Sequence, residues 1–221
     1  MLEILCAEIT SAEIALQSVA DRIVFAPQTG TEALVPDFYE FQYLKRNYRK
    51  PIHIFIHPRG RSFSFYYSDE EFKRMKNEII TFGQAAADGF VFGLLTAQGK
   101  IEVSRCREML ELAGELPCSF YLAADRCDSL EAEVYELIRL GFRSVVLPAR
   151  HCRTEELKEI INKYQHRIQI IIGGIDSAEE ISCLAENADA RCFQATGISK
   201  YDSYATADEI KRLKQYSSVN Y

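Results

Sequence analysis

The chain has 221 residues, of which 48% are hydrophobic, and this suffices for one sizeable core near the lower size limit of a complete α/β barrel. Its net charge of −6 argues against nucleic-acid binding, which needs a basic surface. No apolar run approaches the roughly 20 residues that cross a bilayer, so we expect no membrane span. Residues 1–6 lack the basic region of a signal peptide, which predicts a cytoplasmic protein.

The seven cysteines are scattered along the chain, and no two of them form a Cys-x-x-Cys pair. An odd number of dispersed thiols is typical of a reducing compartment. The missing pair argues against a zinc ribbon or a thioredoxin-like redox site.

Eight short apolar segments alternate with amphipathic stretches, which is the pattern of repeated βα units. The expected strands cover residues 2–7, 21–26, 52–58, 89–95, 118–123, 144–148, 168–174 and 191–196. Eight strands in strict alternation with helices predict a single α/β domain over residues 1–221, a (β/α)8 TIM barrel. A doubly wound open sheet is the alternative, although it usually has fewer strands.

The expected helices carry their own signals. Leu157, Ile160, Ile161 and Tyr164 form one apolar stripe at helical spacing. Capping boxes, in which two side chains satisfy free backbone donors, are predicted at Thr10/Glu13, Ser68/Glu71, Ser177/Glu180 and Thr206/Glu209.

Strand alternation predicts which side chains enter the barrel. In the third strand the isoleucines Ile52, Ile54 and Ile56 should face the helices, and the residues between them should face inward. The predicted polar interior comprises Glu3, Arg22, His53, His57, Ser119, Tyr121 and Gln194. We expect Glu3 and Arg22, at the starts of neighbouring strands, to form an ion pair, because a buried unpaired charge is costly.

Functional residues of a TIM barrel lie at the carboxyl ends of the strands. The candidate ligand-binding residues by this rule are His57, Arg59, Tyr121, Asp125 and Gln194. His57, Tyr121 and Asp125 suggest an acid/base cluster, and the arginine suggests binding of a carboxylate or phosphate. The alternative is an interior histidine that bonds to Tyr121 or Gln194. The aromatic stretch 61–68 is either a lid over this end or a plug packed onto it.

Two further sets are weaker candidates. Gly173 and Gly174 end the seventh expected strand and form either an anion-binding turn or a tight turn before a capped helix. Cys127, His151 and Cys152 follow neighbouring strands and offer ligands for Cu(I) or zinc, if their loops converge.

Short motifs along the whole chain carry a family resemblance. They include Leu2-Glu3-Ile4, Ala20-Asp21-Arg22-Ile23, Pro58-Arg59-Gly60, Tyr67-Ser68-Asp69 and Asp88-Gly89-Phe90-Val91-Phe92-Gly93-Leu94-Leu95-Thr96. In this combination and order they resemble the CutC copper-homeostasis proteins. The resemblance implies a TIM barrel, Cu(I) as the bound metal ion, a role in copper homeostasis and a homodimer.

The sequence also departs from that family. The two cysteines proposed to bind Cu(I) are Leu5 and Ala26 here, and neither side chain can ligate copper. Cys6 follows the first position, but alternation turns it outward. Gln194 stands where the family has histidine. The alternative function is therefore a barrel enzyme or binding protein for a small phosphorylated or carboxylated molecule, and the residues do not decide whether the chain is an enzyme.

Overall fold

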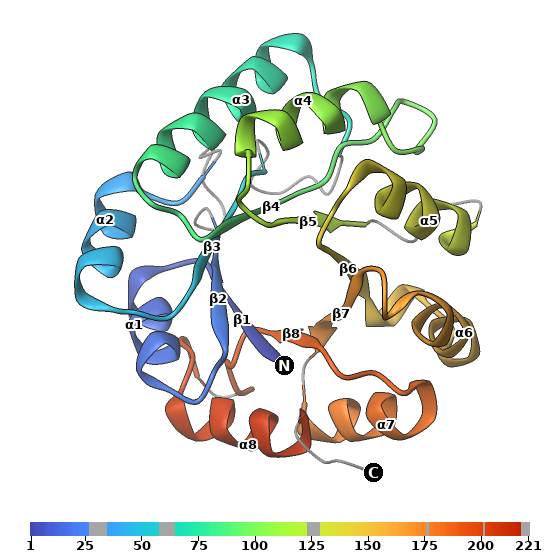
Figure 1. Cartoon of the computed structure of the whole chain (residues 1–221). Helices are drawn as coiled ribbons and strands as arrows, with labels where there is room; N and C mark the ends of the chain where they lie inside the picture. The colour runs from blue at the N-terminus through green and yellow to red at the C-terminus, as the bar shows by residue number, and fades with distance from the viewer. Residues whose placement is uncertain (27–34, 58–64, 123–128, 176, 201, 218–221) are drawn as a thin grey trace.

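A computed structural model describes the chain except for residues 27–34, 58–64, 123–128, 176, 201 and 218–221. Its eight strands are all parallel and form a closed barrel in which each strand pairs with the next and β8 pairs with β1. Figure 1 looks along the barrel, with the helices in a ring outside the strands. The predicted (β/α)8 fold is confirmed.

The strands lie where the sequence places them, although several are shorter than expected. Their bounds are β1 Leu2–Cys6, β2 Arg22–Phe25, β3 Ile52–Phe55, β4 Gly89–Phe92, β5 Cys118–Tyr121, β6 Ser144–Pro148, β7 Gln169–Ile175 and β8 Phe193–Ala195. The helices are α1 Ile9–Gln17, α2 Phe38–Asn47, α3 Asp69–Gln84, α4 Val103–Ala113, α5 Leu130–Leu140, the short 3₁₀ helix η2 Ala149–His151, α6 Thr154–Tyr164, α7 Ala178–Ala188 and α8 Ala207–Ser217. Among the described helices, none is long and apolar enough to cross a membrane.

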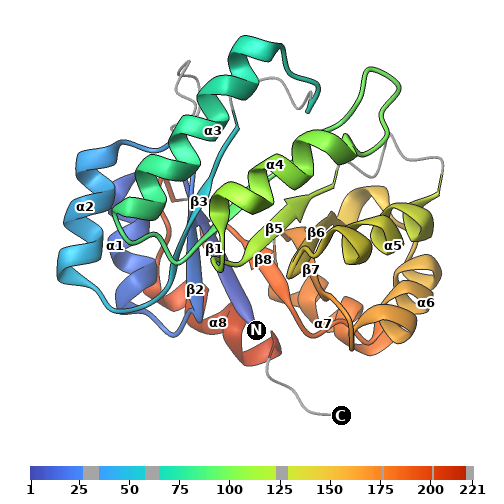
Figure 2. The ribbon, with the colours of Figure 1, turned by 45° about the horizontal axis from the view of Figure 1, so that its top comes forward.

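The main hydrophobic core lies between the strands and the surrounding helices (Figure 2). Ile52, Ile54 and Ile56 are fully buried in it, as strand alternation predicts. Helices contribute large side chains such as Phe82 of α3, and the predicted stripe of α6 is buried at all four positions. Burial of apolar side chains against the outer face therefore fixes which residues point into the barrel.

Two aspartates tie the amino-terminal ends of neighbouring strands together. The Leu2 N–H donates to Asp21 Oδ2 (2.6 Å), and the Ile52 N–H donates to Asp88 Oδ2 (2.7 Å). Each aspartate precedes a strand and satisfies the first donor of the strand before it. Each also pairs with a lysine from a helix, Lys214 for Asp21 and Lys45 for Asp88.

Of the four predicted capping boxes, one is complete and two show the bond from the backbone N–H to the hydroxyl. Ser68 and Glu71 form the complete capping box of α3, and the hydroxyls of Ser177 and Thr206 each accept a backbone N–H three residues on. The cap at Thr10 is wrong. Helix α1 begins at Ile9, so Thr10 lies inside its first turn.

These caps give a matched pair of variants. Ser68→Ala should lower the free energy of unfolding by about 1 kcal/mol, because it leaves a helix donor unsatisfied. Thr10→Ala should change it by less than about 0.5 kcal/mol, since the exposed Thr10 caps nothing and alanine suits a helix. Urea denaturation of both variants measures the difference, and equal losses would contradict these roles.

Candidate functional site

The amino-terminal half of the barrel interior is polar, as predicted. We call this set the barrel floor, and it consists of Glu3, Arg22, His53, Ser119, Ser144, Gln169 and Gln194. Seven of the eight strands contribute one residue each, and β4 contributes Gly89 at the same level as His53. Most TIM barrels fill this space with branched apolar side chains, so the floor is unusual.

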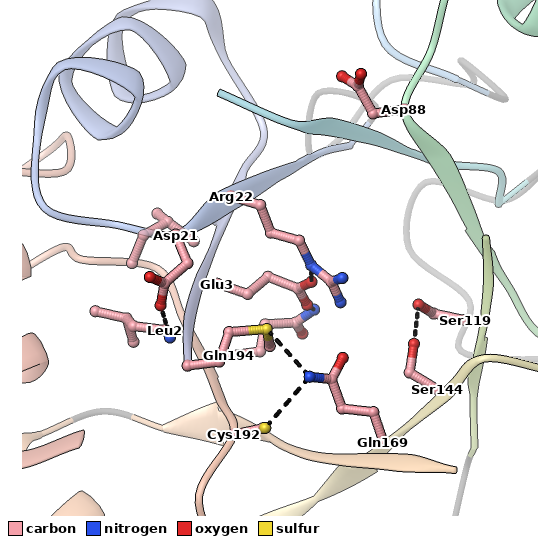
Figure 3. A network of polar contacts seen from close by, with 12 residues as sticks. Leu2, Glu3, Asp21, Arg22, Asp88, Ser119, Ser144, Gln169, Cys192 and Gln194 are labelled. Carbon is pink, nitrogen blue, oxygen red and sulfur yellow. Dashed lines mark hydrogen bonds and ion pairs between the residues drawn. The ribbon is translucent and has the colours of Figure 1, made fainter. Parts of the chain in front are cut away.

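Glu3 is the centre of the floor's hydrogen bonding (Figure 3). Its carboxylate is fully buried, forms the predicted ion pair with Arg22 Nε of β2, and accepts a hydrogen bond from Gln194 Nε2 of β8 (2.7 Å). Across the barrel, the hydroxyls of Ser119 and Ser144 bond to each other at 2.5 Å. Both partners of Glu3 compensate the loss of hydration of a buried charge.

Gln169 connects the floor to residues at the amino-terminal end of the barrel. Its Nε2 lies 3.5 Å from Met1 Sδ and 3.5 Å from Cys192 Sγ. Sulfur accepts hydrogen bonds only weakly, so both contacts are weak. The side chain of Cys192 is partly exposed. Burial is the main cause that raises the pKa of this thiol.

His53 packs tightly against β4. A Cβ atom on Gly89 would come within 2.8 Å of the ring atoms Cε1 and Nε2, so only glycine fits beneath the imidazole. Burial, followed by the nearby charge of Arg22, lowers the pKa of His53 from 6.5 to about 3. The ring is therefore neutral at physiological pH.

The carboxyl-terminal mouth of the barrel is aromatic beside β3, β4 and β5. We call this set the mouth cluster, and it consists of Phe55, His57, Phe65, Tyr67 and Tyr121. The His57 ring stacks on Phe55 at 13°, and its Nδ1 lies 2.9 Å from the Tyr67 hydroxyl. Burial among these rings raises the pKa of Tyr121.

Phe65 and Tyr67 plug the mouth, which decides between the lid and the plug for the described part of stretch 61–68. Both side chains are at least 98% buried. Phe65 lies against Gly93, where a Cβ would approach its ring to 2.6 Å. The Leu95 N–H donates to the Phe65 carbonyl (2.8 Å), so the backbone of the plug is fixed to the segment after β4.

Arg105 of α4 holds the other side of the plug. Its Nη1 donates to the Tyr67 carbonyl (2.8 Å), its Nη2 pairs with Asp69, and its guanidinium lies over the Phe72 ring at 4.8 Å. Sequence reasoning missed this residue because it lies in the first turn of a helix and not at the end of a strand. The inward glycine at position 93 is the signal that could have revealed the insertion of Phe65.

The structure separates the predicted ligand-binding residues. His57 and Tyr121 both belong to the mouth cluster, where Phe65 packs on each of them. Gln194 belongs to the floor and is bound to Glu3. Arg59, Asp125 and Cys127 lie outside the described residues.

The two glycines of the predicted turn lie within β7. Gly173 pairs with Pro148, and a Cβ there would meet Val146 Cγ1 at 2.7 Å. Gly174 has a φ of 74°, at the point where the register between β7 and β8 shifts. The pair therefore forms an irregularity inside the strand, and anion binding by it stays a prediction.

His151 and Cys152, the candidate metal ligands that follow β6, have different surroundings. His151 is exposed in η2, whereas Cys152 packs against the hydrophobic core. Burial, and then Glu156, raise the pKa of Cys152 to about 12, which keeps a metal-binding thiolate scarce. Within the described ranges, no three His, Cys, Asp or Glu side chains gather as a metal-binding group.

Leu5 lies on β1, and Ala26 directly follows the last residue of the neighbouring β2. Leu5 pairs in register with Val24, and the Ala26 N–H donates to the Cys6 carbonyl (2.8 Å). Both follow the inward alternation of Glu3 and Arg22. Cys6 is buried in the outer core, as predicted, and burial raises the pKa of its thiol. The side chains of Leu5 and Ala26 offer no metal ligand, whereas Cu(I) needs soft sulfur or imidazole ligands, so these positions do not fit the ion.

The fold and its interior define a class of protein, namely a small TIM barrel with a polar floor and a plugged mouth. A family model described as the CutC family matches residues 1–199. The chain belongs to the CutC family.

Several relatives cover most of the chain. The human copper homeostasis protein cutC homolog is 28% identical over 92% of this chain and 75% of its own. The Drosophila melanogaster homolog is 32% identical over 86% of this chain and 76% of its own. A family protein CutC from Vibrio vulnificus is 30% identical over 93% and 84%.

Solved structures agree on the fold. The putative copper homeostasis protein CutC from Streptococcus agalactiae superposes with a TM-score of 0.77 at 20% identity, covering 89% of this chain and 98% of its own. A phosphoribosylanthranilate isomerase from Pyrococcus furiosus reaches 0.66 at 12% identity, covering 98% of each chain. Such low identities establish the barrel alone.

The neutral state of His53 predicts a pH dependence of stability. Between pH 6.5 and about 3, the unfolded chain binds a proton at this histidine that the folded chain does not bind. The free energy of unfolding should therefore fall as the pH falls, by about 1.4 kcal/mol per pH unit from this group. His53→Gln should remove that part of the slope.

Urea denaturation of the wild type and His53→Gln from pH 7 to pH 4 measures the difference. The other histidines and the carboxylates are common to both chains, so they cancel in the comparison. Parallel pH profiles of the two proteins would contradict a depressed pKa for His53.

Proposed function

We propose that this chain acts in copper homeostasis, the process for which its relatives are named. The observation that carries the proposal is the family match over residues 1–199, together with relatives at 28–32% identity across most of the chain. Cu(I) is the metal ion that this role implies. The proposal extends to a homodimer, as the family resemblance implies, in the cytoplasm, as the dispersed cysteines suggest.

We further propose that the chain fulfils this role without a Cu(I) site at Leu5 and Ala26. The apolar pair supports this, because no thiolate stands at either inner-face position. Other described thiols are poorly placed. Cys106 and Cys118 are buried like Cys6, and burial raises the pKa of both, to about 12 for Cys118. A rim site at Cys127, His151 and Cys152 stays a prediction.

Copper tolerance of cells tests the role itself. Cells that lack their own family member and are sensitive to copper should regain growth in copper when they express this chain. Challenge with zinc is the control, because general stress protection would rescue growth in both metals. Expression at normal levels without rescue in copper would overturn the proposed function.

Restoring the two cysteines tests the geometry of the mouth. Leu5→Cys/Ala26→Cys should bind one Cu(I) per chain with sub-micromolar affinity, since Leu5 of β1 and Ala26, directly after β2, both follow the inward alternation. The wild type and each single variant should bind at least tenfold more weakly at this place, because one thiolate alone holds Cu(I) poorly. Competition with a Cu(I) chelator under reducing conditions measures all four proteins.

Further replacement of Cys127 and Cys152 by serine separates the mouth from the rim. Tight binding by the wild type that disappears in Cys127→Ser/Cys152→Ser would assign copper to the rim. Tight binding by the double cysteine variant that persists after these serine changes would locate its copper at the mouth. No gain in a folded double variant would contradict the inner-face placement.

The alternative function, binding of a small anionic molecule, receives less support. His57 is engaged by Tyr67 and Phe55, and Phe65 packs on both His57 and Tyr121, so these candidates are occupied by protein contacts. A thermal-shift screen of phosphorylated and carboxylated metabolites tests this function. A shift in melting temperature that Arg59→Ala abolishes would revive it.

A further inference from the structure

Two buried nitrogen atoms in the floor have no hydrogen-bond partner within the described part of the chain. They are Nη2 of Arg22 and Nδ1 of His53. The large majority of buried side-chain polar atoms in folded proteins have a hydrogen-bond partner, which is often an ordered water. His53 is 97% buried, so bulk solvent does not supply the missing bond.

The two residues are neighbours on one face of the sheet. Val24 pairs in register with His53, and Arg22 lies two residues before Val24 on the same inner face of β2. Figure 3 shows the guanidinium of Arg22 pointing into the barrel. The Cε1–Nε2 edge of the His53 ring lies against Gly89, and Nδ1 is the ring nitrogen that is buried without a hydrogen-bond partner.

The charges of the floor restrict what can lie between these atoms. Glu3 and Arg22 form an ion pair, and His53 is neutral. An anion would bring an uncompensated charge next to the Glu3 carboxylate, and a cation would face the guanidinium. A neutral molecule that both accepts and donates a hydrogen bond satisfies both atoms.

We propose that the floor binds one ordered water molecule, which accepts a hydrogen bond from Arg22 Nη2–H and donates one to His53 Nδ1. The bridge requires the Nε2–H tautomer of His53, since Nδ1 must carry a free lone pair. The water also gives Arg22 Nη2 a hydrogen-bond partner, while Nε of the same guanidinium forms the ion pair with Glu3. The site is independent of the copper role, because it uses neither Leu5 nor Ala26.

High-resolution crystal structures of the wild type and His53→Phe test the site. We expect wild-type density within 3.2 Å of both nitrogens, without anomalous signal after a bromide soak, and no such density in His53→Phe. A direct contact of either nitrogen with protein, an empty space or a bromide peak would overturn the proposal. Density that persists unchanged in His53→Phe would show that the water does not bridge.

Nitrogen-15 NMR of the wild-type histidines tests the same bridge without any substitution. His53 should give an unprotonated Nδ1 that accepts a hydrogen bond and a protonated Nε2. A protonated Nδ1 at neutral pH would be incompatible with the bridge. His53→Gln, in which this pair of signals disappears, assigns the resonances.

Discussion

The buried carboxylate of Glu3 is the contact on which the interior depends. It lies on β1, between Arg22 of β2 and Gln194 of β8, and so bonds to both strands that flank the first one. An ionised carboxylate away from water is tolerated only with such partners, and loss of one partner from a buried pair costs about 3–5 kcal/mol.

The two ends of the barrel have opposite characters. The floor is polar and hydrogen-bonded, whereas the mouth, where TIM barrels carry their chemistry, is filled by Phe65 and the rings around it. Between them lies an apolar level that includes Val24, Val91 and Val146. The family resemblance implies Cu(I)-binding cysteines at two positions of this end, and the apolar Leu5 and Ala26 that stand there are consistent with a mouth that belongs to the packed structure.

Sequence reasoning succeeded where the structure depends on local periodicity. The alternation of Ile52, Ile54 and Ile56 predicted the inner face, and with it the ion pair of Glu3. It failed where contacts between residues distant in sequence determine the position of a side chain. The burial of Phe65 depends on Gly93, 28 residues later and just after β4, and the His57 ring bonds to Tyr67, ten residues further along the chain. The cap at Thr10 was wrong because the helix begins before the motif.

The pairing of Asp21 with Lys214 has a consequence for the order of folding. Asp88 finds its lysine 43 residues away in the chain, but Asp21 must wait for α8, 193 residues away. The Ala205 N–H donates to Ser11 across a similar separation, and β8 pairs with β1. Contacts so distant in sequence pay their loop-closure entropy before they form. The junction between the first and last units therefore closes late, and a chain still on the ribosome exposes the open edge of β1 until β8 has been made.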